Sequence, residues 1–254
     1  MMQTFFNPLE VNLLVWLGTF SCAFINGLSK GGLKGMGMVT VPLMVFMYGG
    51  MASTGLLLPI LIFSDFMAFR VYRKSAQWHQ VKKLLPWVLP GLLIAVAVGK
   101  FIHDGTFRDI IAILIIVSLG IILVFDFFGK KVNLSQSPTL SAFTGLLGGF
   151  ASMIGNAAGP LFNLYLLSTR IPKNSFIATG AIFYGTMNLI KVPFHVFAWH
   201  SITWNSFHMN LLMIPAVIAG VYTGKKIASY IPEKAFRMLV LTIIALSALL
   251  LLIK

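Results

Sequence analysis

Long apolar runs dominate this 254-residue sequence and constrain its fold more than any other feature. A helix needs about 20 apolar residues to cross the hydrocarbon core of a bilayer, and six runs approach that length. Only 10% of the residues are charged, whereas a soluble domain carries about 25%. We therefore expect an all-α polytopic membrane protein with a single transport domain over residues 1–254. The six runs are Thr54–Phe69, Leu84–Ile102, Ile110–Phe128, Phe176–Trp199, Phe207–Ile227 and Ala235–Ile253.

The chain is strongly basic, with a formal net charge of +13. The basic residues lie mostly in short gaps between apolar runs, which is typical of topology signals and contacts with anionic lipid. We therefore expect membrane lipid, and no nucleic acid, as a partner. The segment Val71–Lys83 holds four Lys or Arg, whereas His200–Ser206 holds none. Because basic short loops stay in the cytoplasm, both termini are predicted to be extracytoplasmic, in a multi-pass protein of the cell inner membrane.

Two glycine-rich segments interrupt the apolar pattern. The first reads GLSKGGLKGMG from Gly27 to Gly37, and the second reads GNAAGP from Gly155 to Pro160. Glycine costs about 1 kcal/mol in a helix interior and proline breaks the ladder. The apolar flanks look too short to span alone, so we expect a broken or re-entrant helix pair at each segment. Backbone that is not helical at this depth must be satisfied by protein or water, so both breaks are expected to face a central cavity.

The two halves of the chain share landmarks in the same order. Residues 27–37 align without a gap with residues 149–159, and four further landmarks follow. We therefore predict two repeats, at about residues 8–128 and 138–254, with five membrane segments each. Matched loops are expected on opposite sides, so the repeats are inverted, a common construction of secondary transporters. The further matches are Arg70 with Lys191, Trp78-His79 with Trp199-His200, Pro90/Gly99-Lys100 with Pro215/Gly224-Lys225, and Phe107-Arg108 with Phe236-Arg237.

These segments resemble the sulfite exporter TauE/SafE family over essentially the full chain. The similarity rests on NGLSKGGLKGMGMVTVPL (Asn26–Leu43), its degenerate copy GGFASMIGNAAGP (Gly148–Pro160), and PGLLIAVAVGK (Pro90–Lys100). The second copy departs from the usual glycine cluster at residues 156–158. The resemblance implies a transporter of sulfite, sulfonates or related small organic anions, often acting outward. A passive anion channel, or an importer of another small organic or sulfur-containing anion, is the alternative.

The candidate site residues are those that suit a small anion. Free N–H groups at helix N-termini favour negative charge, glycines allow close approach, and a lysine adds a full charge. Asp65, the acid well inside an apolar run, is a candidate for proton coupling or a structural partner of Lys30 or Arg70. Arg70 and Lys191 are candidates for gating, as basic vestibules, or are interfacial anchors. The predicted substrate-binding residues are Ser29, Lys30, Gly31, Gly32, Lys34, Ser152, Gly155, Asn156, Gly159 and Asn163.

Other chemistry finds little support in the sequence. It shows no HExxH motif, no Ser/His/Asp arrangement, no paired carboxylates and no nucleotide-binding loop, so we expect no enzyme. Metal sites need clustered acids or imidazoles, and Cys22 is the only cysteine, so no metal or cofactor is expected. A scaffold that transports nothing remains an alternative. The oligomeric state stays open, a homodimer included.

Overall fold

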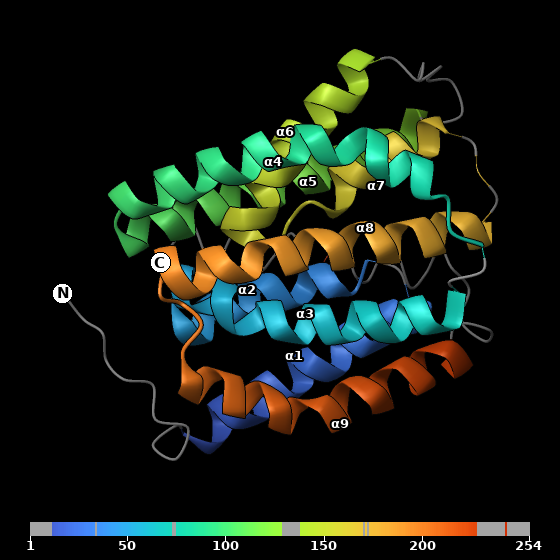
Figure 1. The fold of residues 1–254 in the computed structure, drawn as a ribbon. Coiled ribbons are helices and arrows are strands. Elements are labelled where there is room, and N and C mark those ends of the chain that lie inside the picture. The colour runs from blue at the N-terminus through green and yellow to red at the C-terminus, as the bar shows by residue number, and fades with distance from the viewer. Residues whose placement is uncertain are drawn as a thin grey trace.

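The structure is a computed structural model that describes residues 12–33, 35–72, 75–128, 138–169, 171, 173–227 and 242. Its elements are helices, and these residues contain no strand. In chain order they are α1 (Leu13–Gly31), α2 (Gly37–Tyr48), α3 (Gly50–Tyr72), α4 (Trp78–Phe101), α5 (Asp104–Phe128), α6 (Pro138–Gly155), α7 (Gly159–Ser168), α8 (Lys173–Pro193), the π-helix η3 (Phe194–Ala198) and α9 (Trp204–Ile227) (Figure 1).

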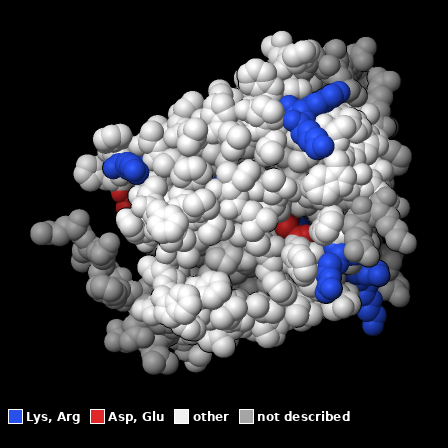
Figure 2. Space-filling view, viewed as in Figure 1, with Lys and Arg blue, Asp and Glu red and all other residues white. Residues whose placement is uncertain are grey.

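Four helices have the length and apolar composition needed to cross a membrane: α1, α3, α4 and α9. Shorter apolar helices accompany them, and the prediction of an all-α, multi-pass membrane protein is confirmed at that level. The predicted run Ala235–Ile253 lies outside the described residues, apart from Thr242. Figure 2 shows that Lys and Arg lie toward the two ends of the bundle, while the middle of this face is largely uncharged. Exposed apolar side chains such as Leu93 (54% exposed) and Leu189 (59%) suit contact with lipid.

The first arm of each broken pair is longer than the sequence indicated. Helix α1 has 19 residues and α6 has 18. Because α1 is long and apolar enough to cross a membrane, the prediction that the apolar flanks are too short to span was wrong for that arm. Helix α1 continues through Gly27 and Gly31 because both glycines face α9. A Cβ on Gly27 would lie 2.9 Å from the Gly220 Cα, and one on Gly31 would lie 3.0 Å from the Lys225 N. Close helix packing therefore outweighs the low helix propensity of glycine.

The breaks themselves are short, and the second arms are short as predicted. The chain leaves helical geometry between α1 and α2 at residues 32, 33, 35 and 36, and between α6 and α7 at residues 156–158. Helix α2 has 12 residues and α7 has 10, well below the length of a span. Gly32 (φ 142°) and Asn156 (φ 52°) both have positive φ, which glycine adopts freely and asparagine tolerates better than most residues.

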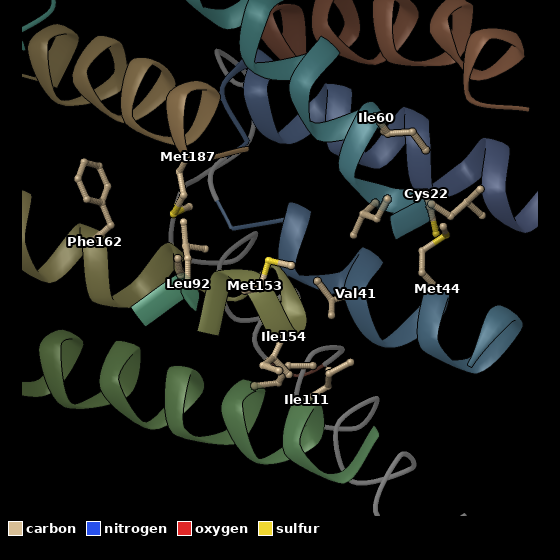
Figure 3. Close-up of a cluster of buried hydrophobic side chains, with 14 of the residues drawn as sticks. Cys22, Val41, Met44, Ile60, Leu92, Ile111, Met153, Ile154, Phe162 and Met187 are labelled. Carbon is tan, nitrogen blue, oxygen red and sulfur yellow. The ribbon is translucent and has the colours of Figure 1, made fainter. Parts of the chain in front are cut away.

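Two extensive contacts join the halves of the chain: α1 packs along α9, and α4 packs along α6. Small residues allow this approach, because a Cβ on Gly149 of α6 would lie 3.1 Å from the Leu92 N of α4. Helix α3 packs against both α8 and α9. Figure 3 shows part of the buried core, where Val41, Ile111 and Met153 come from α2, α5 and α6. The broken pairs are therefore held inside the bundle.

Candidate functional site

The two breaks meet around one cavity of about 240 Å³. Side chains from both broken pairs line it, together with residues of α3 and α8. The N-terminal residues of both short arms, Gly37 of α2 and Gly159 of α7, also face the cavity. Of the residues predicted to bind substrate, the structure brings seven together here: Ser29, Lys30, Gly32, Ser152, Asn156, Gly159 and Asn163.

The other predicted site residues lie elsewhere. Gly31 packs against α9, and Gly155 is buried with Ile111 of α5 as its neighbour. Arg70 is exposed at the end of α3, where its guanidinium lies 5.3 Å from the ring centroid of Phe66. Lys34 lies outside the described residues. Two of the glycines that were predicted to bind substrate therefore pack against neighbouring helices.

At the first break, Lys30 forms an ion pair with Asp65 of α3. The carboxylate is almost fully buried at 1% exposure, whereas the lysine side chain is 21% exposed to the cavity. The second carboxylate oxygen accepts a hydrogen bond of 2.9 Å from Asn188 Nδ2 of α8. The ammonium also lies 4.8 Å from the ring centroid of Tyr184, a cation–π distance. Of the two partners considered for Asp65, the structure gives Lys30 and not Arg70.

At the second break, the buried lysine comes from α8. Lys191 has no exposed surface, and its Nζ donates to Ser152 O (2.9 Å), Ser152 Oγ (3.1 Å) and Asn156 Oδ1 (2.5 Å). Asn156 Nδ2 in turn reaches the Thr54 O of α3 at 3.4 Å. These bonds hold the left-handed turn at Asn156 between α3 and α8.

Three residues of the site were not singled out from the sequence. Asn26 Nδ2 bridges the first break by donating to Thr40 Oγ1 of α2 at 3.0 Å. Tyr184 OH donates to Gly159 O at the start of α7 (3.2 Å), and Asn188 holds Asp65. A polar amide inside a long apolar run is a usable signal, because such groups are rare in membrane helices unless they are paired. That signal would have marked Asn26 and Asn188.

A second cavity, of about 580 Å³, lies between α3, α8 and α9. Its lining is mostly apolar, but it includes Asp65 and Asn210. The Asn210 side chain is 6% exposed, and neither atom of its amide group has a hydrogen-bond partner among the described residues. Asp65 thus contacts Lys30 of the first cavity and also lines the second.

The chemistry of the first cavity favours a hydrogen-bond acceptor as ligand. Its polar lining consists of an ammonium, hydroxyls, amides and backbone groups, while the nearby carboxylate is already paired. In the part of the chain that the structure describes, no group of three His, Cys, Asp or Glu is placed to hold a metal ion.

Comparison with known proteins identifies the family of the chain. Residues 19–251 match the family model described as Sulfite exporter TauE/SafE. That range includes both helix breaks and every candidate site residue. No curated protein and no solved structure matched the chain. Because the family match covers most of the sequence, the protein belongs to the sulfite exporter TauE/SafE family of membrane transporters.

Proposed function

We propose that the protein is a secondary transporter that exports sulfite or an organosulfonate across the cytoplasmic membrane. One observation carries the proposal: two helix breaks, distant in the sequence, line one cavity together with Lys30. Family membership supports a small anionic substrate.

The two short arms support anion binding through their N-termini. Helix α2 begins at Gly37 and α7 at Gly159, and both residues line the cavity. Unpaired N–H groups and the helix dipole give such ends partial positive charge. An oxyanion between them would also meet Lys30 and the hydroxyl of Ser29. Met38 and Val39 N–H of α2 bond to Gly35 O and Met36 O, and Pro160 of α7 has no N–H. The donors proposed for the anion are therefore the N–H groups of Gly37 and Gly159.

Asp65 is the proposed coupling residue. Its carboxylate holds Lys30 in this structure, so a substrate anion competes with it for the ammonium. A proton taken up by Asp65 would remove that competition and release Lys30 to the substrate. This exchange would link anion movement to a proton gradient.

We also propose that the two halves form an inverted repeat with both termini outside the cell. Two extensive helix contacts support this, α1 with α9 and α4 with α6. The proposed symmetry matches α1 with α6 and α9 with α4, so it converts one of these contacts into the other. The direction of the helices supports it too. Helix α3 runs from left to right in Figure 1 and its match α8 from right to left, while α4 and its match α9 are likewise opposed.

The test is transport by purified protein in liposomes. Replacing Lys30 with Ala should weaken binding and flux of the best oxyanion by roughly tenfold or more, since a hydrogen bond to a charged group contributes about 1.5–3 kcal/mol. Lys100→Ala, an exposed change on α4, is the matched control and should have no effect. Unchanged flux in Lys30→Ala would remove Lys30 from the site. Concentrative uptake driven by a proton gradient distinguishes the carrier from a passive anion channel.

A further inference from the structure

Lys191 is a buried lysine whose described hydrogen-bond partners are all uncharged. Its side chain has no exposed surface, and its Nζ contacts only oxygens of Ser152 and Asn156 within hydrogen-bond distance. The described residues contain one ion pair, and it joins Lys30 to Asp65 instead. Burying an ammonium without an acidic partner costs stability, so we expect Lys191 to have a role other than stabilising the fold. The position of Lys191 behind the second break indicates that role.

The hydrogen bonds of Lys191 determine which atoms of Ser152 and Asn156 act as acceptors and how these side chains are oriented. A lysine ammonium has three donors and no acceptor, so all three of the contacted oxygens are acceptors. The hydroxyl of Ser152 therefore keeps its own hydrogen for another partner. The amide of Asn156 must turn Oδ1 toward Lys191 and its NH₂ group away from it.

The hydrogens that remain belong to side chains that line the cavity. Ser152 and Asn156 are both part of its wall. The hydroxyl of Ser152 has no other hydrogen-bond partner in the described chain. One N–H of Asn156 reaches Thr54 O at 3.4 Å, a long hydrogen bond, which leaves the second N–H free. This side of the cavity thus has donors to offer a ligand.

The charges around the cavity do not balance. Lys30 and Lys191 bring two positive charges, whereas Asp65, the partner of Lys30, brings the one negative charge beside them in the described residues. One positive charge is left over in a buried setting, where electrostatic attraction is strong. While Asp65 is ionised, a ligand with a single negative charge would balance it.

We propose that Lys191 is a positioning residue that makes the second break an anion-binding half-site. It turns Ser152 and Asn156 into hydrogen-bond donors and, with Lys30 and Asp65, favours a monoanion over a dianion. This inference rests on the proposed function, because it assigns a role at the same cavity. It also gives the degenerate second motif a function: the lysine missing from that break is supplied by α8.

The experiment measures binding of methanesulfonate, a monoanion, and sulfate, a dianion, to purified full-length protein by calorimetry. Asn156→Asp is the decisive variant. Its carboxylate still accepts from Lys191, so the fold is kept, but it adds a negative charge and removes the N–H donor. We expect methanesulfonate affinity to fall about a hundredfold in protein that still folds, because the contact with Lys191 is kept although the bond to Thr54 O is lost. Lys191→Gln should lower the affinity for methanesulfonate by roughly tenfold and lower that for sulfate by more, because losing a positive charge costs a dianion more than a monoanion. Lys100→Gln is the matched exposed control.

Wild-type affinity and selectivity in folded Asn156→Asp protein would overturn the inference while leaving the proposed function intact. The same holds if Lys191→Gln lowers only the melting temperature and its folded fraction binds normally. If Lys191→Gln does not fold, Asn156→Asp decides alone. A wild-type protein that binds neither methanesulfonate nor sulfite would instead contradict the proposed function itself.

Discussion

Each of the two helix breaks has an ammonium beside it, near the same cavity, but the two ammonium groups differ in origin. The first break carries Lys30 on its own helix and takes its acidic partner, Asp65, from α3. The second break carries neutral acceptors, Ser152 and Asn156, and takes its lysine from α8. In the gap-free alignment, Ser152 stands where the first half has Lys30. The ammonium beside the first break thus comes from α1, and the one beside the second break comes from α8.

This difference shows that a sequence motif alone does not reveal which charged groups meet at a site. Judged by sequence, the second copy has lost its lysines, yet in space an ammonium still lies at the break. The chemistry also differs: Lys30 is partly open to the cavity, whereas Lys191 acts on it through two other side chains. We therefore expect the first break to contact the anion by charge and the second by oriented donors.

Removing the acid of the first break should have the largest effect on stability. Asp65→Ala leaves Lys30 without its acidic partner, and breaking one side of a buried pair costs on the order of 3 kcal/mol. Thermal unfolding in detergent measures this. The double change Lys30→Met with Asp65→Leu should restore much of the stability, because the charges leave together, but it should not restore anion binding. Asp109→Asn, at an exposed position of α5, is the control. A stable Asp65→Ala protein would mean that the pair does not hold the first break.

The first arms of the two broken pairs, α1 and α6, pack closely on their neighbours in the same way. Replacing a glycine in either arm should therefore have an intermediate effect on stability. Gly27→Ala and Gly149→Ala each push a methyl group into the facing helix, at α9 and α4 respectively. Overpacking of this kind costs about 2 kcal/mol, so both variants should unfold at lower temperature and by similar amounts. Gly120→Ala is matched to them, because a Cβ there would meet nothing within 4 Å. Loss of stability at one glycine alone would show that the two arms pack differently.

The smallest predicted effect on stability comes from removing a hydrogen bond that anchors α7, the short arm after the second break. Tyr165 OH of α7 donates to Gln80 Oε1 of α4 at 2.8 Å, whereas α2 is tied to its own first arm by Asn26 and Thr40. Tyr165→Phe leaves the buried Gln80 oxygen without this donor and should cost about 1 kcal/mol. Tyr222→Phe, on a ring that is 66% exposed, should be neutral in the same unfolding assay. Equal results for the two would mean that α7 is held by packing alone.

Much of the helical framework could be predicted from apolar runs and glycine breaks. The run Phe207–Ile227 lies within α9 (Trp204–Ile227), and GNAAGP spans the second break. The first break was placed too early because Gly27 and Gly31 read as breakers, although they serve contact with α9. That distinction depends on which helix faces the glycine, which one sequence does not contain.

The candidate site was predictable in its segments but not in its pairings. Asp65 was expected to pair with Lys30 or Arg70, and only the structure separates the two. The contact between Lys191 and Asn156 could not be predicted, because they lie 35 residues apart on elements whose relative rotation depends on tertiary packing. That Lys191 acts on the anion stays a prediction.

The central claim is that both breaks form one anion site, and the stoichiometry of binding tests it most directly. Calorimetry with methanesulfonate should give one anion per chain for the wild type. Lys30→Ala and Asn156→Asp, each made alone, should both weaken that single binding event. Two anions per chain, with each variant removing only one of them, would show two separate sites and contradict the account.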